Sequence, residues 1–291
     1  MTLIKSISGI RGTIGGKVGE NLTPLDVVKF SAAYGKWIKT QRRKDNYKVV
    51  VGRDARISGK MVQSLVMQTL SGMGIHVVDL ELSTTPTVEV AVTMEHADGG
   101  IILTASHNPK QWNALKLLNK DGEFLNAEEG EQILRFVEEE DFDFAEVNDL
   151  GKISFHNAYI DLHIEEVLKL NLVEVDRIKN SKFKVVVDAV NSSGGISIPP
   201  LLEMLGVEVV KLYCEPTGEF PHNPEPLAKN LQDLSKLVKE EHADLGIAVD
   251  PDVDRLALVD EKGEMFGEEY TLVSVADYVL SRKKGATVSN L

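Results

Sequence analysis

The strongest constraint on the fold of this chain is an internal repeat. The stretch EHADGGIILTASHNP at residues 95–109 is matched by EHADLGIAVDPDVDR at residues 241–255, which lies 146 residues later. Two shorter echoes precede these copies in the same order. KVVVGRDARISG returns as KVVVDAVNSSGG after 136 residues, and GMGIHVVDLEL returns as MLGVEVVKLYC after 132 residues. Three echoes in one order and at similar spacings indicate that one folding unit occurs twice.

Both copies alternate short apolar runs with helical patterns, which is typical of α/β folds. We therefore expect two repeated three-layer α/β domains with mixed sheets. Strands are expected at residues 48–52, 75–80, 101–103 and 256–259, and helices at residues 23–39, 61–73, 126–140 and 157–170.

An acidic, turn-rich stretch, DFDFAEVNDLG, predicts a domain boundary near Gly151. The expected domains are residues 1–152 and residues 153–259, each holding one copy of the repeat. Residues 260–291 are expected to start a third domain.

The third domain is expected to be incomplete in this chain. An amphipathic helix is expected at residues 268–283, and ATVSNL at residues 286–291 resembles the opening of a strand. A single helix and half a strand cannot bury their apolar faces, so we expect the chain to be a truncated piece of a longer protein.

Charge and cysteine content exclude several function classes. The formal net charge of −13 leaves no basic stripe to neutralise nucleic-acid phosphates, so no nucleic-acid partner is expected. A phosphorylated ligand would need a bound cation or a few well-placed basic side chains. The single cysteine, Cys214, fits a reducing compartment. No stretch approaches the roughly 20 apolar residues of a membrane span. We therefore expect a cytoplasmic protein without a membrane partner.

An aspartate-rich loop follows the apolar run GIAV. Asp250, Asp252 and Asp254 alternate with other residues and would repel one another without a cation. Carboxylate oxygens are the ligands that Mg²⁺ prefers, so the loop predicts a magnesium site. Three alternatives to the magnesium site remain. They are a solvated acidic turn, an EF-hand loop with Glu261 in the last ligand position, and a phosphatase site with Asp250 as the nucleophile.

A serine occupies the equivalent loop of the first copy. Ser106 ends a strand and precedes an Asn-Pro turn, with His107 next to it and Lys116 in the same region. Aligning the two copies sets Ser106 opposite Asp252. Ligands bind at the carboxyl ends of strands in open α/β sheets, so both loops are expected to share one cleft. A serine attacks phosphorus only with a base or a cation nearby.

Taken together, these segments resemble the α-D-phosphohexomutases. The resemblance extends over essentially the whole chain and rests on five stretches in the family's order. They are SGIRG at residues 8–12, GRDARISG at residues 52–59, TASHNPKQWNALK at residues 104–116, HNPEPLAKNL at residues 222–231 and DPDVDR at residues 250–255.

The resemblance implies an intramolecular phosphotransferase that interconverts hexose or hexosamine 1-phosphates and 6-phosphates through a phosphoserine and a sugar bisphosphate. Ser106 would be the phosphoserine. Asp250, Asp252 and Asp254 would hold Mg²⁺, with the phosphate on Ser106 as a further ligand. The third domain would recognise the sugar, so the chain alone is expected to be poorly active.

The resemblance also assigns roles to basic residues. Lys116 and Arg255 match residues of acid–base catalysis or phosphoryl stabilisation, and both would contact the substrate. Arg11 matches an arginine that lines the active site, His107 is a candidate catalytic residue, and Arg56 is expected to support the serine loop. Lys116 is favoured as the base because the pKa of arginine exceeds ~12.

Two residues depart from the family pattern. Pro251 stands where the metal loop usually has glycine, and Ala114 replaces a glycine in the serine loop. Both changes affect loop geometry without removing a chemical group. The enzyme classes that remain open are a phosphoglucosamine mutase and a phosphomannomutase/phosphoglucomutase. The alternatives of other classes are a metal-dependent aspartyl phosphatase and a non-catalytic sugar-phosphate-binding protein. Self-association is left open.

Overall fold

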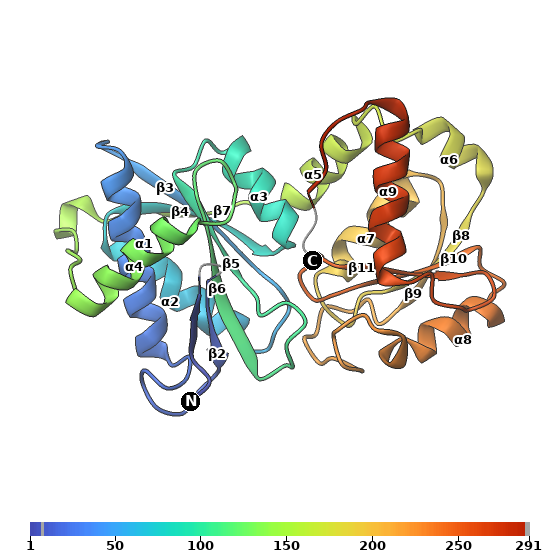
Figure 1. The fold of residues 1–291 in the computed structure, drawn as a ribbon. Helices are drawn as coiled ribbons and strands as arrows, with labels where there is room; N and C mark the ends of the chain where they lie inside the picture. Colours follow the sequence, from blue (N-terminus) through green and yellow to red (C-terminus); the bar gives the residue numbers. More distant parts are fainter. Residues whose placement is uncertain (7–8, 289–291) are drawn as a thin grey trace.

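The chain forms two α/β units that lie side by side (Figure 1). The structure is a computed structural model that describes residues 1–6 and 9–288. None of the described helices combines the length and the apolar character needed to cross a membrane.

The first unit is built on a seven-stranded mixed sheet with the order β1-β2-β6-β5-β3-β4-β7. The strand β3 pairs in parallel with β4 and β5, whereas β6 pairs antiparallel with β5 and β2. The strands are β1 (Ile4–Ser6), β2 (Gly9–Thr13), β3 (Tyr47–Arg53), β4 (Ile75–Leu82), β5 (Gly99–Leu103), β6 (Trp112–Leu118) and β7 (Ile153–Phe155).

Helices cover both faces of this sheet. One face carries α1 (Pro24–Gln41), α2 (Gly59–Gly72) and α4 (Ala127–Glu139), and the other carries α3 (Thr85–Met94). A short 3-10 helix, η1 (Val147–Asp149), follows α4.

Local signals explain where two of these helices begin. The Thr23 side chain accepts a hydrogen bond from the backbone N–H of Asp26, and the Asn126 side chain accepts one from the backbone N–H of Glu129. Each of these caps satisfies a backbone donor that the first helical turn leaves free. The expected helices at residues 23–39 and 126–140 are therefore confirmed.

The second unit has a four-stranded mixed sheet with the order β11-β10-β8-β9. Its α6 and α7 cover one face and α8 covers the other, with separate apolar clusters on the two sides. The strands are β8 (Lys184–Asp188), β9 (Glu208–Leu212), β10 (Leu245–Val249) and β11 (Leu256–Asp260), and the helices are α5 (Tyr159–Leu168), α6 (Val175–Ser181), α7 (Gly194–Met204), η2 (Ala228–Asn230) and α8 (Gln232–Glu240).

The structure confirms the repeat and the fold class. The order β11-β10-β8-β9 reproduces β6-β5-β3-β4, with the same parallel and antiparallel pairings. Even the left-handed turns recur, because His96 has φ 49° and its equivalent His242 has φ 50°. These residues lie in the turn between α3 and β5 and in the turn between α8 and β10, so the EHAD sequence encodes the same helix-to-strand turn twice.

The strand β7 lies just beyond the boundary expected near Gly151. It pairs with β4 and so extends the edge of the first sheet. The limits of the three domains stay predictions.

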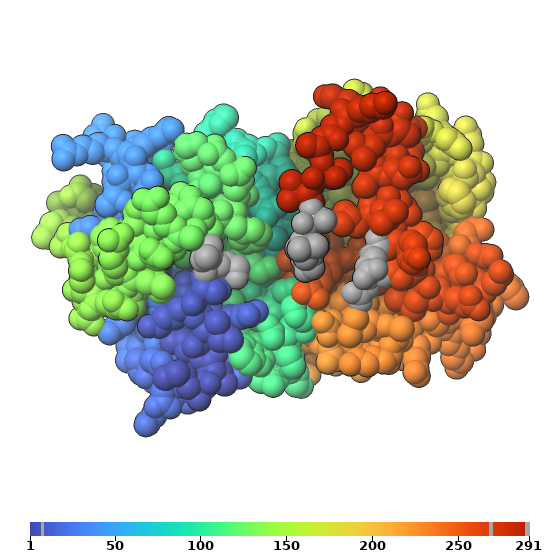
Figure 2. Space-filling view, viewed as in Figure 1, coloured from blue at the N-terminus to red at the C-terminus, as the bar shows by residue number. Residues whose placement is uncertain are grey.

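The predicted C-terminal helix is confirmed as α9 (Glu268–Arg282). It follows β11 as α4 follows β6, and it lies on the surface of the second unit (Figure 2). The Tyr278 hydroxyl donates to the Leu172 carbonyl at 2.8 Å, and Arg282 forms an ion pair with Glu174.

The strand expected after α9 is wrong for the residues that the structure describes. Residues 286–288 are not in a strand, and residues 289–291 lie outside the described part of the chain. A strand is stabilised by backbone hydrogen bonds to a neighbour, and among the described residues no strand pairs with this segment.

Close backbone contact joins the two units at Gly218. This residue has φ +75°, and a Cβ atom there would lie 2.0 Å from the carbonyl oxygen of Ala55. Nearby, the Ala55 N–H donates to the Ser192 hydroxyl at 3.3 Å. Only glycine therefore allows this approach of the second unit to the first.

We expect Gly218→Ala to lower the free energy of unfolding by roughly 1–3 kcal/mol, because it adds steric overlap to a left-handed backbone. Gly19→Ala is the matched control, since Gly19 has φ +77° but nothing within 4 Å of a new Cβ atom. Denaturant unfolding measures both variants. Equal losses would show that the contact at Ala55 does not stabilise the pair of units.

Candidate active site

The serine loop and the aspartate loop meet between the units. Ser106 follows β5 and Asp250 follows β10, at the carboxyl ends of equivalent strands. The Ser106 hydroxyl donates to Oδ2 of Asp250 at 2.7 Å. The shared cleft expected from the repeat is thus present, although the alignment had set Ser106 opposite Asp252.

A buried arginine shapes the serine loop. Asp54 accepts from Nε of Arg56 at 3.0 Å and from the Thr104 hydroxyl at 2.7 Å. The same guanidinium donates to four loop carbonyls, those of Ser106, Asn108, Pro109 and Trp112. Ser106 itself has φ 47°, a backbone conformation that non-glycine residues rarely adopt. Arg56 thus supports the serine loop, as the sequence suggested.

The aspartate loop concentrates negative charge. Asp250 and Asp252 are fully buried, and carboxylate oxygens of these two residues and Asp254 lie within 4.8 Å of one another. The pKa of Asp250 is raised well above its usual range by burial and by the two neighbouring carboxylates. Backbone N–H groups of Asp254 and Arg255 each donate to Oδ1 of Asp250 at 3.1 Å.

Lys116 offsets part of this charge. Its ammonium lies 2.7 Å from Oδ2 of Asp252 and 2.9 Å from Oδ2 of Asp254. Although burial opposes a charged lysine, the two carboxylates raise its pKa above the ordinary value. Burial also disfavours the charged form of Asp252, but the contact with Lys116 outweighs it and lowers the pKa of Asp252.

The aspartate loop fits a divalent cation. Oδ1 of Asp252 is buried and has no hydrogen-bond partner among the described residues. An unpaired carboxylate oxygen in the protein interior is costly, and coordination to a hard cation would satisfy it. Three carboxylates from one loop, with one oxygen left unpaired, form a donor set suited to Mg²⁺.

A pocket of about 260 Å³ opens over the serine. It brings together all five residues that the sequence placed beside the substrate or in catalysis, namely Arg11, Ser106, His107, Lys116 and Arg255. Of the SGIRG stretch, Ser8 lies outside the described residues.

Arg11 reaches the pocket from β2 because this strand pairs with β6. Its pairing partner in the register is Ala114. Gly9, two residues earlier, has φ +120°, and a Cβ atom there would lie 2.3 Å from the Leu115 carbonyl oxygen. The close approach of the two strands explains the need for this glycine.

His107 and Arg255 flank the serine. Nδ1 of His107 lies 3.3 Å from the Ser106 hydroxyl. Burial and the positive charge of Arg255 lower the pKa of His107, which favours the neutral imidazole. Arg255 lies 3.6 Å from Glu225, which belongs to the HNPEPLAKNL stretch. That stretch is anchored where His222 contacts Asp188 at 3.0 Å.

Sequence reasoning missed two residues of α3. The Thr85 hydroxyl donates to Oδ2 of Asp252 at 2.5 Å, and its N–H donates to the Asp252 carbonyl at 2.8 Å. Glu89, one turn later, has a raised pKa because of burial, against the opposing effect of Lys116. The TTP run around Thr85 carries only a helix-start signal, so no local pattern pointed to this contact between the units.

The two departures from the family pattern are accommodated. The Pro251 carbonyl accepts hydrogen bonds from the hydroxyls of Ser192 and Ser193, both at 2.7 Å. The left-handed residue of this loop is Val253, with φ 64°. Ala114 is a buried residue of the regular strand β6, where no positive φ is needed. Loop geometry is therefore maintained by other residues.

The structure also decides against two alternatives for the aspartate loop. The EF-hand interpretation is wrong, because the loop leads into the strand β11 and not into a helix. The solvated acidic turn is wrong as well, since Asp250 and Asp252 are buried. An aspartyl nucleophile is disfavoured, because both oxygens of Asp250 accept hydrogen bonds.

We expect Asp254→Asn to lower the affinity for Mg²⁺ by roughly tenfold or more, because one of three anionic ligands is lost. Asp254 is partly exposed, so the fold should tolerate the change. Asp121→Asn, which removes an exposed carboxylate in the first unit, is the matched control. Calorimetric titration measures both. Equal affinity in Asp254→Asn and the unchanged protein would refute the metal assignment.

Comparison with known proteins gives a consistent result along most of the chain. The family model described as phosphoglucomutase/phosphomannomutase, alpha/beta/alpha domain I, matches residues 3–144. The model of alpha/beta/alpha domain II from the same description matches residues 159–263. The two matches correspond to the two repeated units.

Individual relatives agree. A "Phosphoglucomutase/phosphomannomutase" of Thermococcus kodakarensis is 37% identical over 94% of this chain and 60% of its own length. A "Probable phosphoglucosamine mutase" of Methanosphaera stadtmanae is 35% identical over 98% of this chain and 61% of its own length. A solved phosphoglucomutase/phosphomannomutase family structure from Burkholderia thailandensis has a TM-score of 0.80 at 27% identity, covering 98% of this chain and 61% of that one. The chain thus spans about 60% of the length of these relatives.

Proposed function

Since this chain belongs to the phosphoglucomutase/phosphomannomutase family, we propose that it carries the phosphoryl-transfer site of a hexose-phosphate mutase. The reaction would interconvert the 1-phosphate and 6-phosphate of a hexose or hexosamine. The observation that supports this most is the 2.7 Å hydrogen bond from Ser106 to Asp250, inside a cluster of three carboxylates. It sets a nucleophile beside a site for a divalent cation.

The proposed reaction begins with Ser106 phosphorylated. The free hydroxyl of a sugar monophosphate attacks this phosphorus, the bond between phosphorus and the serine oxygen breaks, and a sugar bisphosphate forms. The bisphosphate then turns over, and the Ser106 oxygen takes back the other phosphate. In each half a proton moves between the serine and the sugar hydroxyl, so the site needs a group that relays it.

Asp250, Asp252 and Asp254 would hold Mg²⁺, which offsets the negative charge on the transferring phosphoryl group. The buried, unpaired Oδ1 of Asp252 supports this assignment. The relatives that match are named as mutases of phosphosugars, which supports the substrate class.

Lys116 and His107 have different proposed roles, charge stabilisation for Lys116 and proton transfer for His107. The raised pKa of Lys116 keeps it protonated in the arrangement described here, so it acts as a cation that steadies charge near the serine. It can act as the base that the sequence favoured only when a bound cation takes over the charge of its carboxylate partners. His107, neutral and 3.3 Å from the Ser106 hydroxyl, is the better placed proton relay.

Arg11 and Arg255 complete the substrate side of the pocket. Both line the 260 Å³ space above Ser106. Guanidinium groups bind phosphate through paired hydrogen bonds, so these two arginines suit the phosphate that is not being transferred. A protein that only binds sugar phosphates would not need a serine hydroxyl bonded to a carboxylate cluster, so this arrangement opposes the non-catalytic alternative.

We place the protein in the cytoplasm, because its single cysteine fits a reducing compartment and its proposed substrate is phosphorylated.

Mapping of the phosphate tests the proposal on this chain. After incubation with glucose 1,6-bisphosphate and Mg²⁺, we expect a gain of ~80 Da, confined to the peptide that contains Ser106. Ser106→Ala should gain none. A hydroxylamine-sensitive phosphate on Asp250 would instead support the aspartyl phosphatase.

A further inference from the structure

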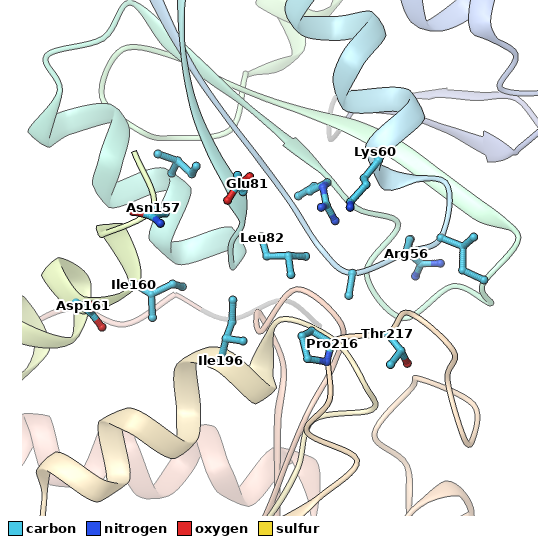
Figure 3. Close-up of a pocket in the computed structure, with 14 residues that line it drawn as sticks. Arg56, Lys60, Glu81, Leu82, Asn157, Ile160, Asp161, Ile196, Pro216 and Thr217 are labelled. Atoms are coloured by element: carbon cyan, nitrogen blue, oxygen red, sulfur yellow. The ribbon is translucent and has the colours of Figure 1, made fainter. Parts of the chain in front are cut away.

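A second, larger cavity lies between the units. Its volume is about 760 Å³, and none of its lining residues also lines the pocket over Ser106. The first unit contributes the end of β3, the start of α2 and the end of β4. The second contributes α5, α7 and the loop after β9 (Figure 3). Cavities of this size hold small metabolites.

One wall of the cavity contains a buried arginine without an ionic partner. Arg53 is 7% exposed, its Nε donates to Gln63 at 2.9 Å, and its Nη1 donates to the Asp54 carbonyl at 3.1 Å. Among the described residues, Nη2 has no hydrogen-bond acceptor and the guanidinium forms no ion pair. Of the nearby carboxylates, Asp54 pairs with Arg56 and Asp79 accepts from Gln63. Glu81 also lines the cavity and acts on Arg53 electrostatically, but it forms no ion pair with it.

A second cation stands next to it. Lys60 lies in the first turn of α2, is exposed, and forms no ion pair with any residue that the structure describes. Figure 3 shows its side chain reaching from α2 toward the cavity. The Ser58 side chain does not cap this helix, so the positive end of the helix dipole adds to the two side chains.

The cavity is polar at both ends, and between them apolar side chains lie beside the carboxylate of Glu81. Asp161 and Asn157 lie on the side away from Lys60, while Leu82 and Ile196 lie between the two ends (Figure 3). A ligand that fits this distribution of charged and polar side chains has an anionic group at the end near Lys60 and hydroxyl donors at the end near Asp161. A buried guanidinium is stabilised by a paired anion, whereas an unpaired one costs free energy.

We propose that this cavity is a binding site for a phosphate monoester with a small hydroxylated body, separate from the serine–aspartate site. Its phosphate would contact Arg53 and Lys60, and its body would contact α5 of the second unit. The proposal does not depend on the mutase reaction, because it concerns binding alone.

Occupancy of the cavity would also affect the serine loop. Arg56 is one of the residues that line the cavity, and its buried guanidinium donates to the Ser106, Asn108, Pro109 and Trp112 carbonyls. A ligand that restrains Arg56 would therefore restrain the loop of the nucleophile. Binding in the cavity would therefore change the mobility of the serine loop through Arg56.

Calorimetric titration with glycerol 3-phosphate, without Mg²⁺, tests the site. We expect Lys60→Met to weaken binding roughly tenfold, since a charge-assisted hydrogen bond is lost. Lys60→Arg and the remote control Lys236→Met should keep the affinity. Arg255→Met, which alters the pocket over Ser106, should keep it too. Loss in Arg255→Met with no change in Lys60→Met would overturn the proposal and leave the mutase assignment standing.

Two further readouts test its parts. Inorganic phosphate should bind more weakly than glycerol 3-phosphate, and equal affinity would overturn the assignment to an ester. Hydrogen exchange should slow on binding at residues 53–60 and 157–161, and also at residues 104–112 of the serine loop. Unchanged exchange in the loop while the other two segments slow would overturn the coupling through Arg56.

Discussion

Replacing Lys116 with methionine is expected to slow the transfer of phosphate to Ser106 by roughly 10²–10⁴-fold, the range typical of a positioned acid–base or electrostatic group. The Lys116 ammonium lies 2.7 Å from Asp252 and 2.9 Å from Asp254, and it lines the pocket over the serine. Methionine keeps most of the side-chain volume and removes the charge. The rate is measured by intact mass in a single turnover with glucose 1,6-bisphosphate and Mg²⁺.

Lys120→Met is the matched control, because Lys120 is an exposed lysine of the same unit that pairs with its neighbour Asp121. Its rate should equal that of the unchanged protein. A Lys116→Met rate within threefold of the control would remove Lys116 from the proposed catalytic group. Mg²⁺ affinity should be measured in the same variants, so that a loss of the cation is not mistaken for a loss of catalysis.

Replacing Arg56 with methionine is expected to lower the free energy of unfolding by roughly 3–5 kcal/mol, because removal of one partner leaves the buried Asp54 carboxylate unpaired. Both side chains of this ion pair are fully buried. The change also frees the four loop carbonyls that the guanidinium binds, so the Ser106 loop should exchange its amide hydrogens faster. Denaturant unfolding and hydrogen exchange measure the two effects.

Arg135→Met is the matched control, since Arg135 is an exposed arginine of α4. It should change stability by less than about 0.5 kcal/mol, as surface substitutions usually do. Arg56→Lys tests geometry, because an ammonium cannot reproduce the planar fork that binds several carbonyls at once. Full stability in Arg56→Met would show that the serine loop folds without this support.

Much of the fold could be predicted from local patterns. The apolar runs that became β3, β4, β5 and β11, and the capped starts of α1 and α4, depend on residues close in sequence. Because the sequence repeats, the same topology could be predicted for both halves of the chain. The repeat even includes the left-handed backbone of His96 and His242. The expected strand at residues 286–291 failed in its described part, because a strand depends on a partner as well as on its own residues.

The sequence by itself determined the chemical groups of the site. Ser106 and the three aspartates follow the carboxyl ends of β5 and β10, Lys116 lies within β6, and all five occur in the order of a known family. Only the tertiary structure decided their pairing. Ser106 bonds to Asp250, although its aligned counterpart is Asp252.

The tertiary structure alone also decided the contacts between the units. Thr85 bonds to Asp252 across 167 residues, and Arg53 lines a cavity with α5 of the other unit. The physical reason is that hydrophobic patterns and caps act within an element, whereas these contacts depend on how two separately folded units dock. Docking is set by shape, such as the close approach at Gly218, and no sequence period records it.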